Sequence, residues 1–169
     1  MEASQLLEKT NKLLAERARI NSELAKSLFS DLKEYINSLE GISAIEWTQY
    51  TPYFNDGDPC TFRLYVTGVH LDLNAPKLKE AMANSETLTS GLSSEAASKN
   101  IPDSVRLEEG WCNFDKHLLP SEILENIKKA KKLNETLRNC KDILEDELGD
   151  GYRVFLTKTK LYTEEYSHD

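Results

Sequence analysis

The sequence predicts an α+β fold in which a small antiparallel sheet, made of a hairpin and a C-terminal strand, packs against two long helices. Residues 3–39 and 120–148 repeat leucine and isoleucine at helical spacing. Residues 43–73 and 152–162 alternate apolar and polar side chains, as half-buried strands do. Because these strands and helices do not alternate as β–α–β units, a helix-covered antiparallel sheet is expected.

Length, charge and cysteine content limit the classes of protein to which this chain can belong. A chain of 169 residues fits a single domain, over residues 1–169, and its net charge is −8. That acidity argues against general nucleic-acid binding, which needs a basic face. Three widely spaced cysteines indicate reduced thiols in a cytosol. With no apolar leader and no apolar run of about 18 residues, we expect a cytoplasmic protein without membrane association.

The first predicted helix, over residues 3–39, is unusually long. Leu6, Leu13 and Ile20 recur every seven residues, and Gly41 stands where a helix C-cap belongs. At 1.5 Å per residue such a helix is about 50 Å long, longer than a compact domain of this size. Its first half therefore frays, or it pairs in a coiled-coil-like way with the second long helix or with another chain. A homo-oligomer is the expected result of the last case.

The hairpin over residues 43–73 is expected to have strands near residues 43–50 and 60–67. Ile45, Trp47 and Gln49 share one strand face, and the turn around Gly57 separates the strands. A short helix then opens at Pro76, and residues 83–104 form a polar, flexible excursion rich in serine.

The second long helix is predicted over residues 120–148. Pro120 fits its first position and Gly149 its C-cap. Ile123, Ala130, Leu137 and Leu144 form its apolar seam. A single strand over residues 152–162 follows.

The hairpin loop is the first candidate site, because it combines aromatic and acidic side chains. The aromatic residues either fill the core and lock the loop or form a recognition surface, and the inward position of Trp47 favours the core. The candidate ligand- or partner-binding residues are Trp47, Tyr50, Tyr53, Phe54, Asn55, Asp56 and Asp58.

A metal site is the alternative for the same loop. An EF-hand starting at Asp56 would need further oxygen ligands at Cys60 and Thr67, so that motif is excluded and an Asx-stabilised turn is the simpler interpretation. If the C-terminal tail folds back, His168 could meet Asp56 or Asp58 and make a carboxylate–imidazole pair. The candidate catalytic residues are then His168 and Asp169, the candidate metal ligands are Asp56, Asp58 and His168, and otherwise no cofactor is expected.

The hairpin and the tail also carry a resemblance. The segment from Trp47 to Cys60 reads W-T-Q-Y-T-P-Y-F-N-D-G-D-P-C, and the chain ends E-Y-S-H-D. Together these motifs resemble a group of small uncharacterised proteins from tailed phages and bacteria. The resemblance implies a phage or bacterial origin and a cytoplasmic setting, in the host if the protein is phage-encoded. It supplies no catalytic residue.

Three function classes follow from the sequence. The first is a non-enzymatic binding protein that self-associates through its long helices and acts on a host protein or sequesters a small host molecule. The second is a metal-dependent hydrolase or nuclease-like enzyme that uses Asp56, Asp58, His168 and Asp169. The third is a structural assembly component. The absence of a complete catalytic motif favours the first class over an enzyme.

Overall fold

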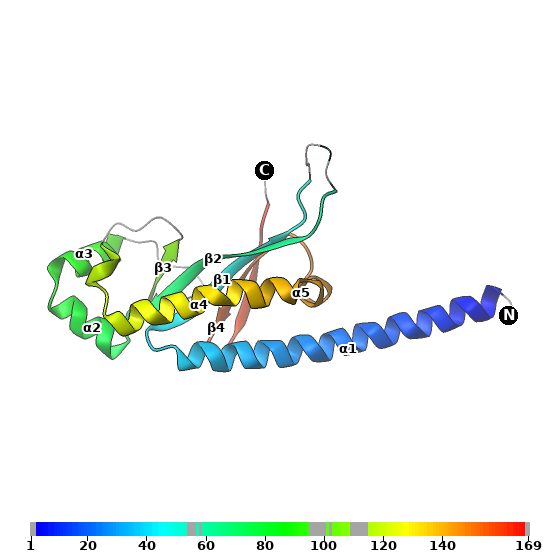
Figure 1. The fold of residues 1–169 in the computed structure, drawn as a ribbon, viewed down its shortest axis with the longest axis horizontal. Helices are drawn as coiled ribbons and strands as arrows, with labels where there is room; N and C mark the ends of the chain where they lie inside the picture. Colours follow the sequence, from blue (N-terminus) through cyan, green and yellow to red (C-terminus); the bar gives the residue numbers. More distant parts are fainter. Residues whose placement is uncertain are drawn as a thin grey trace.

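The computed structural model describes residues 3–53, 57, 59–94, 101, 103–108 and 115–167, and it confirms the α+β class (Figure 1). The helices and strands, in chain order, are α1 (Ala3–Ser38), β1 (Ile42–Tyr50), β2 (Arg63–Asp72), α2 (Pro76–Ala83), α3 (Glu86–Ser94), β3 (Ser104–Glu108), α4 (Ser121–Asn139), α5 (Lys141–Leu148), β4 (Tyr152–Thr157) and β5 (Leu161–Glu165). None of the described helices is long and apolar enough to cross a bilayer.

The described strands form one antiparallel sheet of five strands, in the order β3-β2-β1-β4-β5. It is larger than the predicted hairpin plus one strand, because β3 joins at one edge and β5 at the other. The predicted single strand over residues 152–162 is wrong in this respect. A turn divides it into β4 and β5, and the hydroxyl of Thr157 accepts the backbone N–H of Lys160 within that turn.

Helices α1, α4 and α5 lie on one face of the sheet, where α1 and α4 contact the strands and α5 packs against α1 and α4; the main core lies in this layer. The C-terminal half of α1 contributes Leu32 and Ile36, and α4 lies across β1 and β2 (Figure 1). Trp47 and Ile45 of β1 point into this layer, as the alternation predicts. Gly41 ends the α1 turn with φ +80°, and a side chain there would also collide with Ile123, since its Cβ would lie 2.9 Å from the Ile123 Cδ1 atom.

The second long helix is not continuous. It is divided into α4 and α5 at Cys140, whose backbone (φ −100°, ψ 12°) leaves the α-helical region. Asn139 and Cys140 both have weak helix propensity, and Leu137 and Leu144 on either side of the bend are buried in the same core. The apolar seam was predicted correctly, but the single helix over residues 120–148 is corrected to two helices.

The segment over residues 83–104 also differs from the prediction. Residues 86–94 form α3, in which Leu88 and Leu92 are buried. The Ser85 hydroxyl accepts the N–H of Leu88, which caps the start of this helix. An apolar pair at i and i+4 and an N-cap serine therefore outweigh the polar composition, and the predicted flexible excursion is wrong for residues 86–94. Residues 95–100 and 102 lie outside the described residues.

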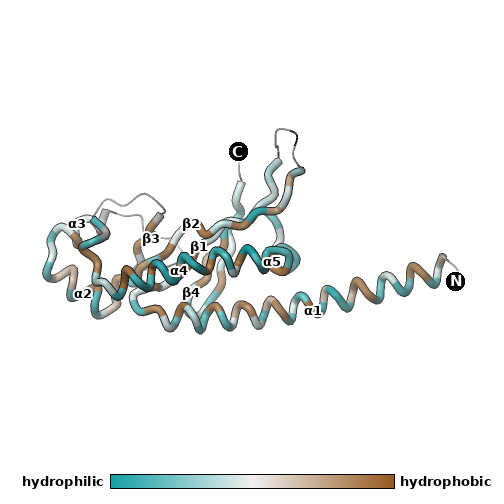
Figure 2. The backbone as a smooth tube through the Cα atoms, viewed as in Figure 1, coloured by the Kyte–Doolittle hydropathy of each residue, from teal (hydrophilic) through white to brown (hydrophobic). Residues whose placement is uncertain are grey.

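The predicted first helix is confirmed, and its N-terminal half extends beyond the rest of the molecule (Figure 1). We call residues 3–20 the arm. Every residue of the arm is exposed, whereas Ala25, Leu32 and Ile36 further along α1 are buried. Apolar positions nevertheless recur along its whole length (Figure 2).

Candidate functional site

Among the residues selected from the sequence, the structure describes Trp47, Tyr50 and Tyr53, and these three do not form one site. Trp47 is fully buried on the helix-covered face, and its indole N–H donates to the side-chain oxygen of Gln49 at 3.0 Å. The Gln49 amide in turn donates to the backbone carbonyl of Gly149. Trp47 is therefore a core residue, and its place among the candidate partner-binding residues is corrected.

Tyr50 and Tyr53 do reach the surface, beside the C-terminal segment. Tyr50 lies 5.5 Å from Tyr166 between ring centroids, and Tyr53 is 89% exposed. These three tyrosines border a depression of about 120 Å³. The Tyr166 N–H donates to the carbonyl of Gly151 at 2.7 Å, so this part of the tail is held at the base of the hairpin. Phe54, Asn55, Asp56, Asp58, His168 and Asp169 lie outside the described residues, and their predicted roles stay predictions.

The strongest polar cluster of the described chain is centred on Glu46, on the sheet face opposite the three helices. Arg106 of β3 binds the Glu46 carboxylate with both ends of its guanidinium group, at 2.6 and 2.7 Å. The Thr67 hydroxyl donates to the same carboxylate at 3.0 Å, and His70 Nε2 lies 3.1 Å from it. Arg153 of β4 adds a longer ion pair at 3.6 Å. The cluster thus connects β1 with β2, β3 and β4.

Gly68 allows this arrangement. A Cβ atom at that position would lie 3.0 Å from the Arg106 Nε atom and 3.3 Å from a Glu46 carboxylate oxygen. The arginine side chain therefore crosses β2 over a residue that has no side chain of its own. Substitution by alanine would move the guanidinium away from the carboxylate.

The electrostatics make Glu46 a permanent anion at neutral pH. Burial alone would raise the pKa of this carboxyl, but hydrogen bonds from His70 and Arg106 and the charge of Arg106 outweigh it and lower the pKa to about 2. Glu46 and His70 are both fully buried, and Arg106 is 19% exposed. Since both carboxylate oxygens are occupied and no surface reaches them, the cluster is a structural clasp between strands and not an open reaction site.

Sequence reasoning missed the Glu46 cluster for a physical reason. Glu46 alternates with Ile45 and Trp47, so its strand position indicated a solvated face. Its partners Arg106 and Arg153 come from β3 and β4, which are distant in the chain. The available signal was the alternation itself, which places Glu46, His70 and Phe155 on one face once the strand order is known.

The arm is the most extensive exposed apolar feature of the described residues. Apolar side chains on one side of it are between 43% and 62% exposed, and Leu24 just beyond it is 48% exposed. The exposed apolar residues along this stretch of α1 are Leu6, Leu7, Leu13, Leu14, Ile20 and Leu24. We call the rest of the described chain, from residue 21 onward, the body. At its junction with the arm, Asn21 hydrogen-bonds Asp146 of α5 at 2.5 Å and Arg17 pairs with the same carboxylate at 3.5 Å.

The stripe on the arm is continuous with the core-facing side of α1. Leu7, Leu14, Ala25 and Leu32 are seven or eleven residues apart, spacings that return to nearly the same side of an α-helix. Ala25 and Leu32 use that side to bury themselves against the body, while Leu7 and Leu14 present it to solvent. The arm therefore has the side chains of a packing face.

Comparisons with known proteins give no assignment. No family model matches the chain, and no curated protein or solved structure matches it. Within the described part of the chain, no group of three or more His, Cys, Asp or Glu side chains is placed to hold a metal ion. The predicted metal ligands Asp56, Asp58 and His168 lie outside that part.

Proposed function

We propose that this chain is a non-enzymatic interaction protein that self-associates by pairing the arms of two copies. One observation carries the proposal: the arm and its junction expose six leucine and isoleucine side chains, of which Leu7 and Leu14 lie on the side that α1 elsewhere uses for packing. Most of the stability of a helix in a protein comes from packing of its apolar face, and the apolar face of the arm is exposed. Pairing would bury the leucines and stabilise the helix at the same time.

The arm is basic, whereas the rest of the chain is acidic. The arm carries four cations and two anions, hence +2, whereas the whole chain carries −8, which leaves −10 for the remaining residues. The arm is thus the part of the chain that a second acidic copy repels least.

Charge also favours antiparallel pairing over parallel pairing. Antiparallel pairing centred near Leu13 and Leu14 keeps the two acidic bodies apart. It also brings the basic arm of one copy toward the acidic helix α5 of the other, which contains Asp142, Glu145 and Asp146. The same two-fold arrangement lets one surface patch serve both copies.

Sedimentation analysis over a range of protein concentrations tests the proposal. The wild-type chain is expected to dimerise, and Leu13→Glu is expected to remain monomeric because it places a charge in the paired face. Ala15→Glu is the matched control, since it adds the same charge two residues away on the opposite, exposed side of the arm. A wild-type chain that stays monomeric at all concentrations, or equal effects of the two variants, would contradict the proposal.

The other predicted functions have no observation in their favour among the described residues. The host partner, the small-molecule ligand, the assembly role and the metal-dependent enzyme built on Asp56, Asp58, His168 and Asp169 stay predictions. A metal titration of the wild type and of Asp58→Ala separates the enzyme from the others.

A further inference from the structure

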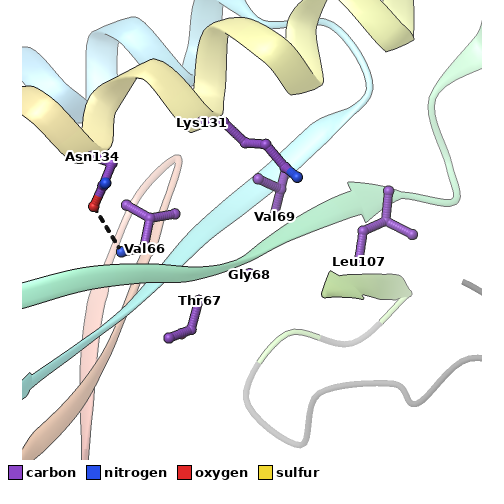
Figure 3. A pocket seen from close by; sticks show the side chains of 7 residues that line it. All are labelled: Val66, Thr67, Gly68, Val69, Leu107, Lys131 and Asn134. Carbon is purple, nitrogen blue, oxygen red and sulfur yellow. Dashed lines mark hydrogen bonds between the residues drawn. The ribbon is translucent and has the colours of Figure 1, made fainter. Parts of the chain in front are cut away.

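A second surface, independent of the arm, lies between the edge of β2 and helix α4. β3 pairs with β2 over Gly68–Asp72. On that side, no described strand pairs with residues 63–67 of β2. The N–H of Val66 points outward there and donates to the side-chain oxygen of Asn134 at 3.1 Å (Figure 3). The side-chain oxygen of Asn134 thus takes the place that the backbone carbonyl oxygen of a neighbouring strand would have.

The backbone of this edge is arranged to accept another strand. N–H and C=O groups of alternate residues point to the same side of a strand, so Leu64 presents its pair to the same side as Val66. Leu64 itself is 2% exposed because its side chain points into the core. The buried side chain of Leu64 fixes this part of the edge, and an added strand would displace the Asn134 side chain from the Val66 N–H.

A groove runs along this edge. Its larger part has a volume of about 720 Å³ and lies between Arg63 and Tyr65 of β2 and Arg138 of α4. A smaller extension of about 60 Å³ continues past Asn134 toward Val69 and Leu107 (Figure 3). The bend at Cys140 ends α4 beside the groove and places Lys141 on its wall.

The charge of the groove is opposite to that of the chain. Arg63, Arg138 and Lys141 line its larger part together with a single acid, Glu135. The Arg138 guanidinium lies 5.9 Å from the centre of the Tyr65 ring, a cation–π contact that positions it over the strand. Three cations and one anion in a chain of net charge −8 favour an anionic ligand.

We propose that this groove binds an extended peptide segment with acidic side chains, which adds a strand to β2 along residues 63–66. Backbone hydrogen bonds to the β2 edge supply affinity, and alternate carboxylates reach Arg63, Arg138 and Lys141. The strand edge favours a peptide over a nucleic acid, because its alternating donors and acceptors match another backbone in the extended conformation.

The probe is a short capped peptide of alternating valine and glutamate, titrated into the full chain while backbone amide signals are followed by NMR. We expect shifts at Leu64, Val66 and the end of α4. The charge-reversed peptide of valine and lysine is expected not to bind. The acidic peptide methylated on alternate backbone nitrogens is expected to lose binding, because it cannot donate the strand hydrogen bonds.

Protein variants complete the test. Arg138→Glu is expected to weaken acidic-peptide binding by roughly tenfold or more, the loss of a charge-assisted contact. Lys132→Glu makes a like charge reversal on an exposed position of α4 that does not line the groove, and is expected to leave binding unchanged. Circular dichroism and the melting temperature establish that each variant is folded.

Three results would overturn the proposal. The first is an absence of shifts at millimolar acidic peptide. The second is equal binding of the methylated and unmethylated peptides, which would reduce the site to non-specific charge attraction. The third is a response of these amides to a single-stranded oligonucleotide and not to the peptide, which would assign the groove to nucleic acid.

Discussion

The two halves of α1 share one apolar pattern, but only the C-terminal half is covered by other described residues. Leu32 and Ile36 are at most 4% exposed, while Leu7 and Leu13 of the arm are 62% and 57% exposed. Helical periodicity is the same in both halves. The comparison teaches that a periodic pattern specifies which face of a helix packs, and leaves open whether the partner belongs to the same chain.

The body and the arm also differ in how their charges are held. In the body, Glu46 is buried and bound by Arg106 through two short hydrogen bonds. On α1 near the junction, the Arg19–Glu23 ion pair at 2.8 Å leaves both side chains more than 60% exposed. Exposed pairs of this kind contribute little to stability, whereas a buried charge that loses its partner is costly.

The largest expected effect of a single substitution therefore lies in the body. Glu46→Gln is expected to lower the free energy of unfolding by about 3–5 kcal/mol, because the half-buried guanidinium of Arg106 loses its counter-charge. The control is Glu16→Gln in the arm, where a surface change of the same kind is expected to cost less than about 0.5 kcal/mol. Urea unfolding at neutral pH measures both. Similar costs for the two variants would show that Glu46 is not the central residue of the strand clasp.

The second-largest expected effect is the difference in unfolding free energy between alanine substitutions in the two halves of α1. Ile36→Ala removes a fully buried side chain and is expected to cost about 2–5 kcal/mol of unfolding free energy. Leu13→Ala is expected to cost almost nothing when unfolding is measured at a concentration where the chain is monomeric. At higher concentration the same variant should dissociate more readily than wild type. A large, concentration-independent cost for Leu13→Ala would mean that the arm packs against its own body.

The sequence was sufficient for those elements whose signals are local. The helix over residues 3–39, the hairpin and the apolar seam of the second helix all follow from periodicity, and the structure confirms them. The break at Cys140 was missed because the seam continues across it. Helix α3 was missed because serine-rich composition obscured Leu88 and Leu92.

The candidate sites were harder to predict because they depend on contacts between distant strands. Whether Glu46 faces water or Arg106 is decided by the position of β3, which no short-range pattern reveals. The β2–α4 groove likewise depends on where β3 pairs with β2. Their pairing covers Gly68–Asp72, and residues 63–67 of β2 pair with no described strand on that side. In contrast, the inward position of Trp47 follows from strand alternation and was expected, and the structure buries this side chain.

The smallest expected effect is the pH dependence of the contribution that Glu46 makes to the free energy of unfolding. The pKa of Glu46 is about 2 in the folded chain, against an ordinary value of 4.5. Because the folded pKa is the lower one, the carboxylate contributes stability that is fully present above pH 4.5 and is lost as the pH falls toward 2. From about pH 6 to about pH 3.5 the resulting loss is about 1–2 kcal/mol.

Other carboxyl groups titrate in the same range, so the informative quantity is the difference in unfolding free energy between wild type and Glu46→Gln. That difference is expected to shrink by this amount on acidification, since the glutamine variant has no proton to take up at residue 46. The corresponding difference for the exposed Glu16→Gln control should stay constant. If the difference for Glu46→Gln does not change between these two pH values, the Glu46 carboxyl is not held by Arg106 and His70 in solution. The contrast between a buried, bound charge in the body and exposed charges on the arm would then be wrong.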